Sequence, residues 1–342
     1  MADPQEFTVR PTQPEDGAAL NDLYHRLTGT RRSIAQWRWE WFDTPAGPAP
    51  SWVIVETASG RIVGHHGVVP ISLVQGGKRL AAARTENTMI DPDMRRRLVY
   101  PPIEARLLGQ LLQRFDLIYT TSGKGSHGLV RKRLGYVSAG TWRTFTVGIT
   151  PAYIAQRLAG GALGRLAAPL GVFTGRARAG WRLEETIDLA RIAAYCARWH
   201  DTGAITPDRS ADYLRWRLTE HPYHHIRLGL FSRDGEPAAF VAWREGKGAK
   251  DTRDIQIEDI CVAGNDVDIF RAAFDALMIR YRAAPARITL RTLDNGRPLA
   301  NAAALMAGRN RRADNGAELL VRSRVDITGV PWDATMVLAE GI

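Results

Sequence analysis

Residues 85–98 read TENTMIDPDMRRRL, and the rest of the chain is organised around them. An apolar strand that ends at Ile90 runs into a turn at residues 91–93 and then into three consecutive arginines. An amphipathic helix, a second strand at residues 117–119 and a short Gly/Ser loop follow. A strand that passes through a basic turn into a helix can hold an anion, because the free N–H groups of the turn and the helix dipole point the same way.

The composition is that of an ordinary globular protein with an excess of basic residues. The 342 residues are 45% hydrophobic and 24% charged, and 46 Lys+Arg against 36 Asp+Glu give a formal net charge of +10. This length predicts two domains, and the charge favours anionic partners such as nucleotides, acidic sugars or a membrane surface. The basic residues are dispersed and form no nucleic-acid-binding motif, which argues against nucleic acid.

The chain carries no sequence signal for secretion or for a bilayer span. No run of about 18 uncharged apolar residues occurs, and the acidic start of the chain has no apolar segment, so we expect a cytoplasmic protein. Cys196 and Cys261 are then two reduced thiols. Residues 151–207 contain a stretch rich in small apolar residues with several arginines, which predicts a packed helical linker. A membrane-facing amphipathic patch is the alternative.

The two halves of the sequence share a pattern. Residues 37–40 read WRWE and precede Pro45, and residues 214–217 read LRWR and precede Pro222 at the same interval. After each proline come a strand, a hairpin with glycine at its tip and another strand. This repetition indicates a tandem duplication. We therefore predict domains at residues 1–150 and 208–342, joined by the linker.

The order of these elements, with IDPDMRRRL at residues 90–98 and KRLGY at residues 132–136, resembles the GNAT superfamily of acyl-CoA-dependent N-acyltransferases. The sequence DYLRWR at residues 212–217 resembles the start of the second domain in tandem members, which are often associated with the modification of polysaccharides or cell-surface sugars. The resemblance implies an α/β (α+β) fold of two tandem GNAT-like domains. Each domain would have a mixed, mostly antiparallel central sheet flanked by helices.

The resemblance also implies a site for acetyl-CoA or another acyl-CoA as co-substrate. In the family, a V-x-P-x-x-R-G-x-G-x-G turn after the fourth strand holds the CoA pyrophosphate, and backbone groups of that strand serve the thioester. The turn glycines fall here on Arg96, Leu98 and Tyr100, so arginine side chains would contact the phosphates. The second copy has VAGND at residues 262–266, without arginine, so the N-terminal domain is the predicted CoA-binding one. The implied CoA-binding residues are Thr88, Met89, Ile90, Arg95, Arg96, Arg97, Leu98, Val99, Ser122 and Lys124.

Direct acyl transfer to a primary amine needs a base for the amine and an acid for the leaving thiolate. Glu86 matches the place where many family members have the base, and an exposed strand carboxylate is its alternative interpretation. The usual tyrosine acid falls on Arg131, so Ser122, Ser126, His127 or Tyr136 would have to substitute. A solvated loop residue is the alternative interpretation of His127. We predict Glu86, His127 and Tyr136 as the catalytic residues.

Two histidine doublets, at residues 65–66 and 224–225, invite a metal-site interpretation. Neighbouring residues on a strand point to opposite faces, so each doublet offers one ligand at most, and we predict no metal. Three functions remain open: an N-acyltransferase acting on an amine of a small molecule or amino sugar, a catalytically degenerate pair that binds a ligand or partner, and an aminoacyl-tRNA-dependent transferase of the same fold.

Overall fold

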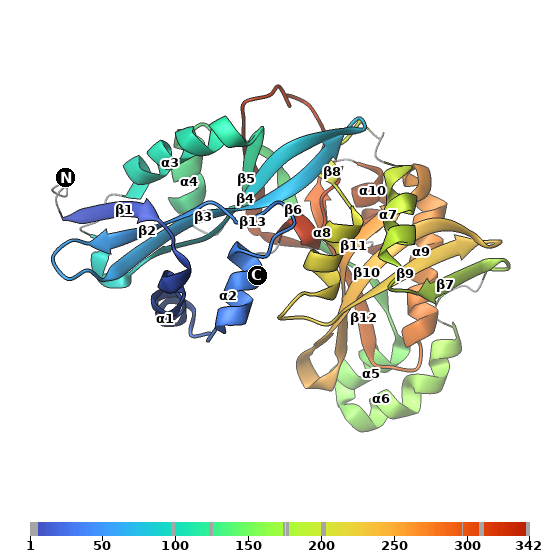
Figure 1. Ribbon diagram of the computed structural model, residues 1–342. Coiled ribbons are helices and arrows are strands. Elements are labelled where there is room, and N and C mark those ends of the chain that lie inside the picture. Colours follow the sequence, from blue (N-terminus) through green and yellow to red (C-terminus); the bar gives the residue numbers. More distant parts are fainter. Residues whose placement is uncertain are drawn as a thin grey trace.

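The structure is a computed structural model that describes residues 6–96, 100–122, 126–173, 175, 178–199, 203–295, 297–307 and 311–339. Two halves lie side by side, each with a twisted sheet between helices (Figure 1). The first half contains β1 (Phe7–Pro11), α1 (Gly17–Thr28), α2 (Ile34–Trp41), β2 (Ser51–Glu56), β3 (Ile62–Gln75), β4 (Lys78–Ile90), α3 (Tyr100–Arg114), β5 (Leu117–Thr121), α4 (Ser126–Arg133) and β6 (Val137–Ile149). The remainder contains α5 (Pro151–Ala159), α6 (Gly161–Ala167), β7 (Trp181–Glu185), α7 (Leu189–Ala197), β8 (Thr206–Pro207), α8 (Ala211–Leu214), β9 (Ile226–Arg233), β10 (Glu236–Lys247), β11 (Arg253–Val262), α9 (Val267–Tyr281), β12 (Ala286–Asp294), α10 (Pro298–Ala307), β13 (Arg311–Ser323) and α11 (Met336–Ala339).

The strands form one continuous mixed sheet whose two ends are built in the same way. The order is β1-β2-β3-β4-β5-β13-β6-β12-β11-β10-β9-β7, with β8 pairing with β3 off this path. Most neighbours are antiparallel, and β4 with β5 and β11 with β12 are the parallel pairs. The series β2 to β5 in the first half is thus matched by β9 to β12 in the second. The predicted fold of two tandem, mostly antiparallel units is confirmed.

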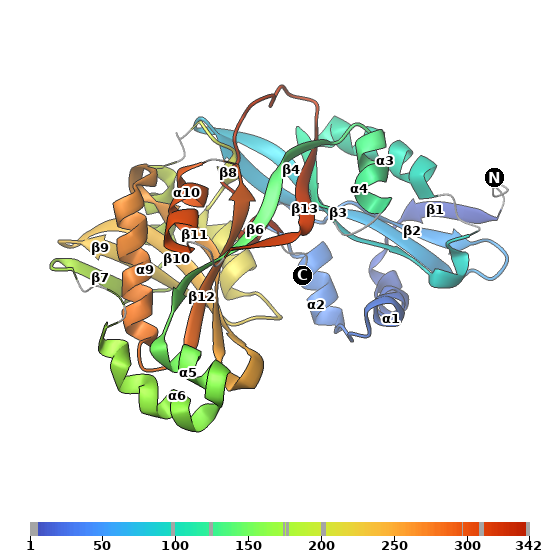
Figure 2. The same ribbon diagram turned by 180° about the vertical axis from the view of Figure 1, so that it is seen from behind.

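The two halves exchange their central strands. Strand β6 follows α4 in the sequence but pairs with β12 of the second half, and β13 follows α10 but pairs with β5 of the first half. The exchanged strands also pair with each other and cross the middle of the molecule (Figure 2). Each half is therefore completed by a strand from the other. The boundaries at residues 150 and 207 stay a prediction.

The repeated tryptophans meet at the centre of the molecule. Trp39 of α2 and Trp216, which follows α8, stack with ring centroids 5.0 Å apart. Each indole Nε1–H donates to the other residue's backbone carbonyl oxygen, and both N···O distances are 3.1 Å. This reciprocal contact is what a local two-fold relation between two copies of one unit produces. The sequence repeat is therefore also a structural one.

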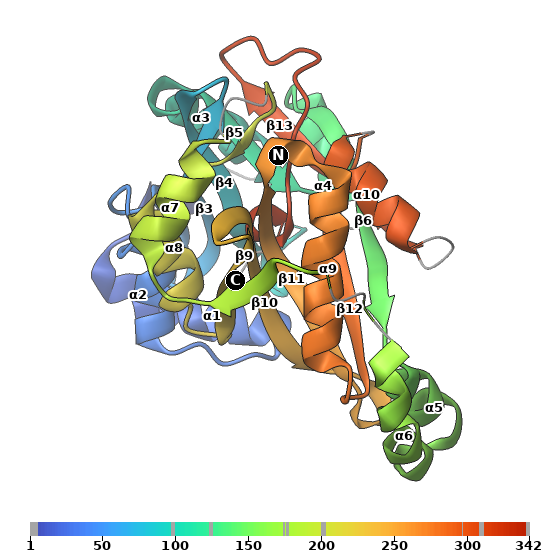
Figure 3. The ribbon, with the colours of Figure 1, turned by 90° about the vertical axis from the view of Figure 1, so that its right-hand side faces the viewer.

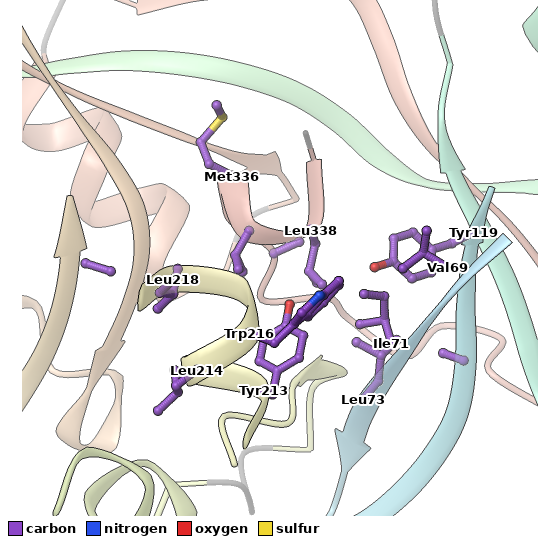
Figure 4. Close-up of a cluster of buried hydrophobic side chains, with 14 of the residues drawn as sticks. Val69, Ile71, Leu73, Tyr119, Tyr213, Leu214, Trp216, Leu218, Met336 and Leu338 are labelled. Carbon is purple, nitrogen blue, oxygen red and sulfur yellow. The ribbon is translucent and has the colours of Figure 1, made fainter. Parts of the chain in front are cut away.

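A hydrophobic core joins the halves around this pair. Val69, Ile71 and Leu73 of β3 and Tyr119 of β5 contribute from the first half, and Tyr213, Leu214, Trp216 and Leu218 contribute from the second, with Met336 and Leu338 of α11 between them (Figure 4). All ten side chains are buried. Because one core spans both halves, burial of apolar surface holds them together as a unit.

Helices cover both faces of each half. In the first half α1 and α2 lie on one face and α3 and α4 on the other; in the second, α7 and α8 lie opposite α9 and α10 (Figure 3). The apolar face of α1 buries Leu20 and Leu23, and α1 ends at Gly29 in the left-handed conformation. Within the described residues, no helix is long and apolar enough to cross a membrane.

Candidate active site

Each half has one gap in its sheet, where two parallel strands separate. In the first half the pairing of β4 with β5 ends at Arg84, and the part of β4 that follows diverges from β5. In the second half β11 pairs with β12 only as far as Ile257. Beyond these points, the backbone of β4 and of β11 no longer pairs with the parallel strand beside it and forms an edge. Such an edge can pair with another chain or with an extended ligand.

In the second half, a backbone segment at residues 332–335 is paired into the gap beside β12, and a cavity lined by Ile260, Val262 and Asp266 lies at the far end of β11. Thr335 forms a β-bridge with Thr292 of β12 and donates its hydroxyl to Asp259 of β11, with an O···O distance of 2.9 Å. The hydroxyl of Thr292 donates to the carbonyl oxygen of Ala334 at 2.7 Å. Trp332, Ala334 and Thr335 are each at most 2% exposed. Opening this gap would mean withdrawing a well-packed segment and breaking its backbone pairing.

The gap in the first half is filled by side chains. Arg131 of α4 donates to Thr120 of β5 at 2.7 Å and to Glu104 of α3 at 3.1 Å, and it reaches Thr88 of β4 at 3.5 Å. Arg131 and Glu104 are buried. On the same face, the hydroxyl of Tyr100 is hydrogen-bonded to Nδ1 of His66. Side chains can change rotamer without breaking the sheet, so this gap is closed less firmly than the other.

Strand β4 bulges where it leaves β5. The register with β3 shifts between His65 and Gly67, which pair with Met89 and Glu86, so two residues of β4 face one of β3. Asn87 in the bulge has φ of +43°, and its carbonyl oxygen is hydrogen-bonded to Nδ1 of His65 at 2.9 Å. A bulge redirects the backbone groups and side chains around it. The bulge therefore determines which backbone groups and side chains at the end of β4 face the gap.

Glu86 lies on the face of β4 that is covered by α1 and α2. Its Oε2 forms an ion pair with Nη2 of Arg84 at 3.0 Å, and only 9% of the residue is exposed. Glu86 is therefore a buried, paired carboxylate and not the exposed strand carboxylate of the alternative interpretation, and its role as a base stays a prediction. Removing one partner of a buried pair leaves an uncompensated charge, so Arg84 and Glu86 hold each other in place.

Glu40 of α2 is a second buried carboxyl at this site, and the sequence interpretation missed it. Its Oε2 lies 2.6 Å from the guanidinium of Arg32, and Asn87 of the bulge donates to its Oε1. Burial raises the pKa of Glu40 to about 8, the negative charge of Glu86 acts in the same direction, and the Arg32 guanidinium opposes both. The signal was present: a glutamate within the aromatic run WRWEW must be buried with its neighbours and needs a partner.

The raised pKa of Glu40 predicts how stability depends on pH. Because the folded-state pKa lies above the value of 4.5 for a free carboxyl, this contribution to stability is complete below pH 4.5 and is lost as the pH rises through 8. In Glu40→Gln this loss is absent. Relative to the wild type, the variant should gain roughly 2 to 4 kcal/mol in the free energy of unfolding between pH 5 and pH 9. Urea titrations at several pH values measure it.

The test is how the difference in unfolding free energy between Glu40→Gln and the wild type changes with pH. Its absolute value is not informative, because Glu40→Gln also leaves Arg32 without its partner and so changes the unfolding free energy at every pH. The exposed Glu15→Gln provides the control, with a flat difference curve. A flat curve for Glu40→Gln would show that Glu40 stays ionised beside Arg32 in the folded protein.

The other predicted site residues are distributed over several places. Met89 is buried at the end of β4, Thr88 and Ile90 are half-buried beside it, and Arg95 and Arg96 are exposed on the following turn. Ser122 is buried and accepts a hydrogen bond from the backbone N–H of Glu318 at 2.7 Å. Outside the described residues lie Arg97, Leu98, Val99 and Lys124, and the side chain of His127 is likewise not described.

Tyr136 lies on the other face of the sheet from Glu86. It is buried among residues of α3 and β5, on the side of the sheet toward which Thr85, the neighbour of Glu86, points. Burial raises the pKa of Tyr136 to about 12. The structure therefore brings Glu86 together with Glu40 and Arg84, and it brings Tyr136 to the face that also carries Arg131 and Tyr100.

Histidines of the first doublet are buried one to each side of β3. Burial lowers the pKa of His65 to about 4 and that of His66 to about 3, so both rings are neutral at pH 7. His65 contacts the bulge, and His66 contacts Tyr100 on the opposite face. In the described part of the chain, no group of three or more His, Cys, Asp or Glu residues could hold a metal ion.

Comparison with known proteins places this fold. No protein-family model and no curated protein matches the sequence. Solved structures match at the level of the fold: a GCN5-related N-acetyltransferase from Anabaena variabilis has 11% identity and a TM-score of 0.63, covering 93% of this chain and 72% of that one. A probable N-acyltransferase from Enterococcus faecalis has 12% identity and a TM-score of 0.67, with the same coverage. Eis1 from Mycobacterium abscessus has 14% identity and a TM-score of 0.54, covering 93% of this chain and 73% of that one.

These neighbours define the class of structure. The chain has the fold of the GCN5-related N-acetyltransferases in a tandem arrangement, as the resemblance at residues 90–98 and 132–136 implied. Sequence identities this low are evidence for the fold alone, so the activity has to be inferred from the site itself.

Proposed function

We propose that the protein is an acyl-CoA-dependent N-acyltransferase whose donor site is the gap between β4 and β5. The observation that carries this proposal is the difference between the two gaps: a backbone segment is paired into the second, whereas side chains that can change rotamer span the first. An acyl-CoA would lie along the open edge of residues 85–90, with Thr88, Met89 and Ile90 next to the thioester. The exposed Arg95 and Arg96 would face its phosphates, with Arg97, Leu98, Val99, Ser122 and Lys124 as further predicted contacts.

The residues around this gap can each take a part in direct transfer. Glu86 is the proposed base for the incoming amine, and Glu40 and Arg84 set its electrostatic surroundings. Arg131 replaces the family's tyrosine and would stabilise the leaving thiolate by its positive charge rather than by donating a proton. Tyr100 is a proton donor at the same gap, and Tyr136 and His127 remain the candidates from the sequence.

The acceptor would approach between the halves, on the face that carries Glu86. Tyr223 of the second half interacts with both Arg32 and Glu40, and Tyr24 of α1 lies over the Arg32 guanidinium, with 4.5 Å between ring centroid and Cζ. The Glu86 carboxylate and the nearby rings of Tyr24 and Tyr223 favour an amine as the acceptor. A primary amine of a small molecule or amino sugar is therefore the proposed acceptor.

Binding of acyl-CoA tests the donor site directly. Calorimetric titration with acetyl-CoA and with longer acyl-CoA thioesters should show a single site. Arg95→Ala/Arg96→Ala should weaken it by about 10- to 100-fold, since two charge-assisted hydrogen bonds to phosphate are lost. Arg106→Ala, on the exposed side of α3, should bind as the wild type does. Failure of every thioester to bind would remove the proposal.

A second candidate is a catalytically degenerate pair that binds a ligand or partner. Two observations favour it: the buried Arg131–Glu104 ion pair occupies the thioester channel, and Glu86 is engaged by Arg84. Release of free CoA thiol, measured with a panel of primary amines, separates the candidates. Binding of acyl-CoA without turnover on any amine would favour the degenerate pair.

A further inference from the structure

The helical hairpin formed by α5 and α6 and the 3₁₀ turn that follows (Ala168–Phe173) turns its large aliphatic side chains toward solvent. It protrudes from the second half of the molecule (Figures 1 and 3). Six of the eleven exposed large hydrophobic residues in the described chain belong to it, and Leu158 is 79% and Leu166 74% exposed. The six are Ile154, Leu158, Leu163, Leu166, Leu170 and Val172. Exposed apolar residues concentrated in this way mark an interaction surface.

The hairpin is firmly seated through small and polar residues. Ala152, Gly164 and Gly171 are buried, and a side chain at Gly171 would collide with the backbone of Arg282. Gln156 donates to the carbonyl oxygen of Lys250 at 2.7 Å, and the Lys250 ammonium donates to the carbonyl oxygen of Arg157 at 2.7 Å. Because the small residues of the hairpin face the protein, its large aliphatic side chains point away from the core.

The charge of this segment is of one sign. Residues 151–183 contain five arginines and no aspartate or glutamate. Arg157 and Arg165 are exposed between the aliphatic side chains, and Lys250 is exposed beside them. A second copy of the chain docking here by two-fold symmetry would bring arginines against arginines, which repel each other. The complementary partner is a surface that is both apolar and anionic.

We propose that the α5–α6 hairpin docks the protein on an anionic lipid bilayer. The aliphatic side chains would enter the boundary between headgroups and acyl chains, while Arg157 and Arg165 would contact lipid phosphates. Apolar burial and electrostatic attraction then act together. This inference does not depend on the acyl-transfer proposal.

Sedimentation with vesicles tests the hairpin. The wild-type protein should bind vesicles of phosphatidylcholine mixed with phosphatidylglycerol, bind phosphatidylcholine alone much more weakly, and lose binding as salt is added. Leu158→Gln/Leu166→Gln and Arg157→Gln/Arg165→Gln should each bind at least about tenfold more weakly. Ile187→Gln, a matched change at a residue that is 83% exposed outside the hairpin, should bind as the wild type does. Thermal melts followed by circular dichroism check that all variants are folded.

Three results would overturn this inference. The first is no binding of the wild type to either vesicle, and the second is equal binding by the hairpin variants. The third is a dimer in analytical ultracentrifugation that Leu158→Gln/Leu166→Gln converts to a monomer, because the aliphatic face would then be an interface between copies of the chain.

Discussion

Glu86→Gln is expected to lower kcat for acyl transfer by about two to four orders of magnitude with little change in KM for the acyl-CoA. The amine must lose a proton as it attacks the thioester, and a positioned base contributes a factor of this size. Glutamine has the same shape as glutamate and can still lie beside Arg84, but it cannot take the proton. Release of CoA thiol under saturating acyl-CoA, with calorimetry for donor binding, separates kcat from binding.

Glu258 offers the matched control for this variant. It stands four residues before the end of β11, as Glu86 stands four before the end of β4, and it is buried in an ion pair with Arg244 at 2.7 Å. Glu258→Gln should therefore carry a similar structural cost and leave kcat unchanged. If both variants lose activity to the same extent, or if Glu86→Gln stays active, Glu86 is not the base.

Trp216→Ala should lower the free energy of unfolding by about 3 to 5 kcal/mol, the usual cost of emptying a large buried aromatic site. The substitution also leaves the carbonyl oxygen of Trp39 without its indole donor. Trp39→Ala should cost a similar amount, and the double variant should cost less than the sum because each residue packs on the other. Urea unfolding followed by circular dichroism measures all three.

The same experiment tests whether the halves unfold together. The shared sheet and the common core predict a single transition that circular dichroism and fluorescence report at the same urea concentration. Trp181→Ala is the control: Trp181 stacks on Phe231 within the second half and is half-buried, so its loss should cost less. Two separate transitions, or a loss below about 1 kcal/mol for Trp216→Ala, would contradict this view of the interface.

Local sequence patterns were sufficient for the tandem fold. The apolar spacing of Leu20 and Leu23 predicts α1, and Gly60 at the tip of the hairpin predicts the turn between β2 and β3, where it has φ of +68°. The repeat of WRWE and LRWR at one interval from a proline is enough to indicate the duplication. These features depend on neighbours along the chain, and a single sequence records them.

The closing of the two gaps could not be predicted in this way. Residues 332–335 pair into the second gap from a distant part of the sequence, and nothing in their composition identifies where they pair. The sequence places Arg131 where the family that it resembles has a tyrosine, but the contacts of Arg131 come from α3, β4 and β5. The role of Glu40 likewise depends on Arg32 and on the bulge at Asn87. Contacts between distant segments are determined by the fold as a whole, and one sequence does not reveal them.

The exchange of β6 and β13 has a consequence for how the protein is made. The first half contains the proposed donor site, yet β5 ends at Thr121 and its neighbour β13 begins only at Arg311, about 190 residues later in synthesis. At about 5 to 20 residues per second, this corresponds to a wait of about 10 to 40 s. During that time the edge of β5 is exposed to other chains. The nascent first half is thus a natural client for chaperones that shield unpaired strands until synthesis is complete.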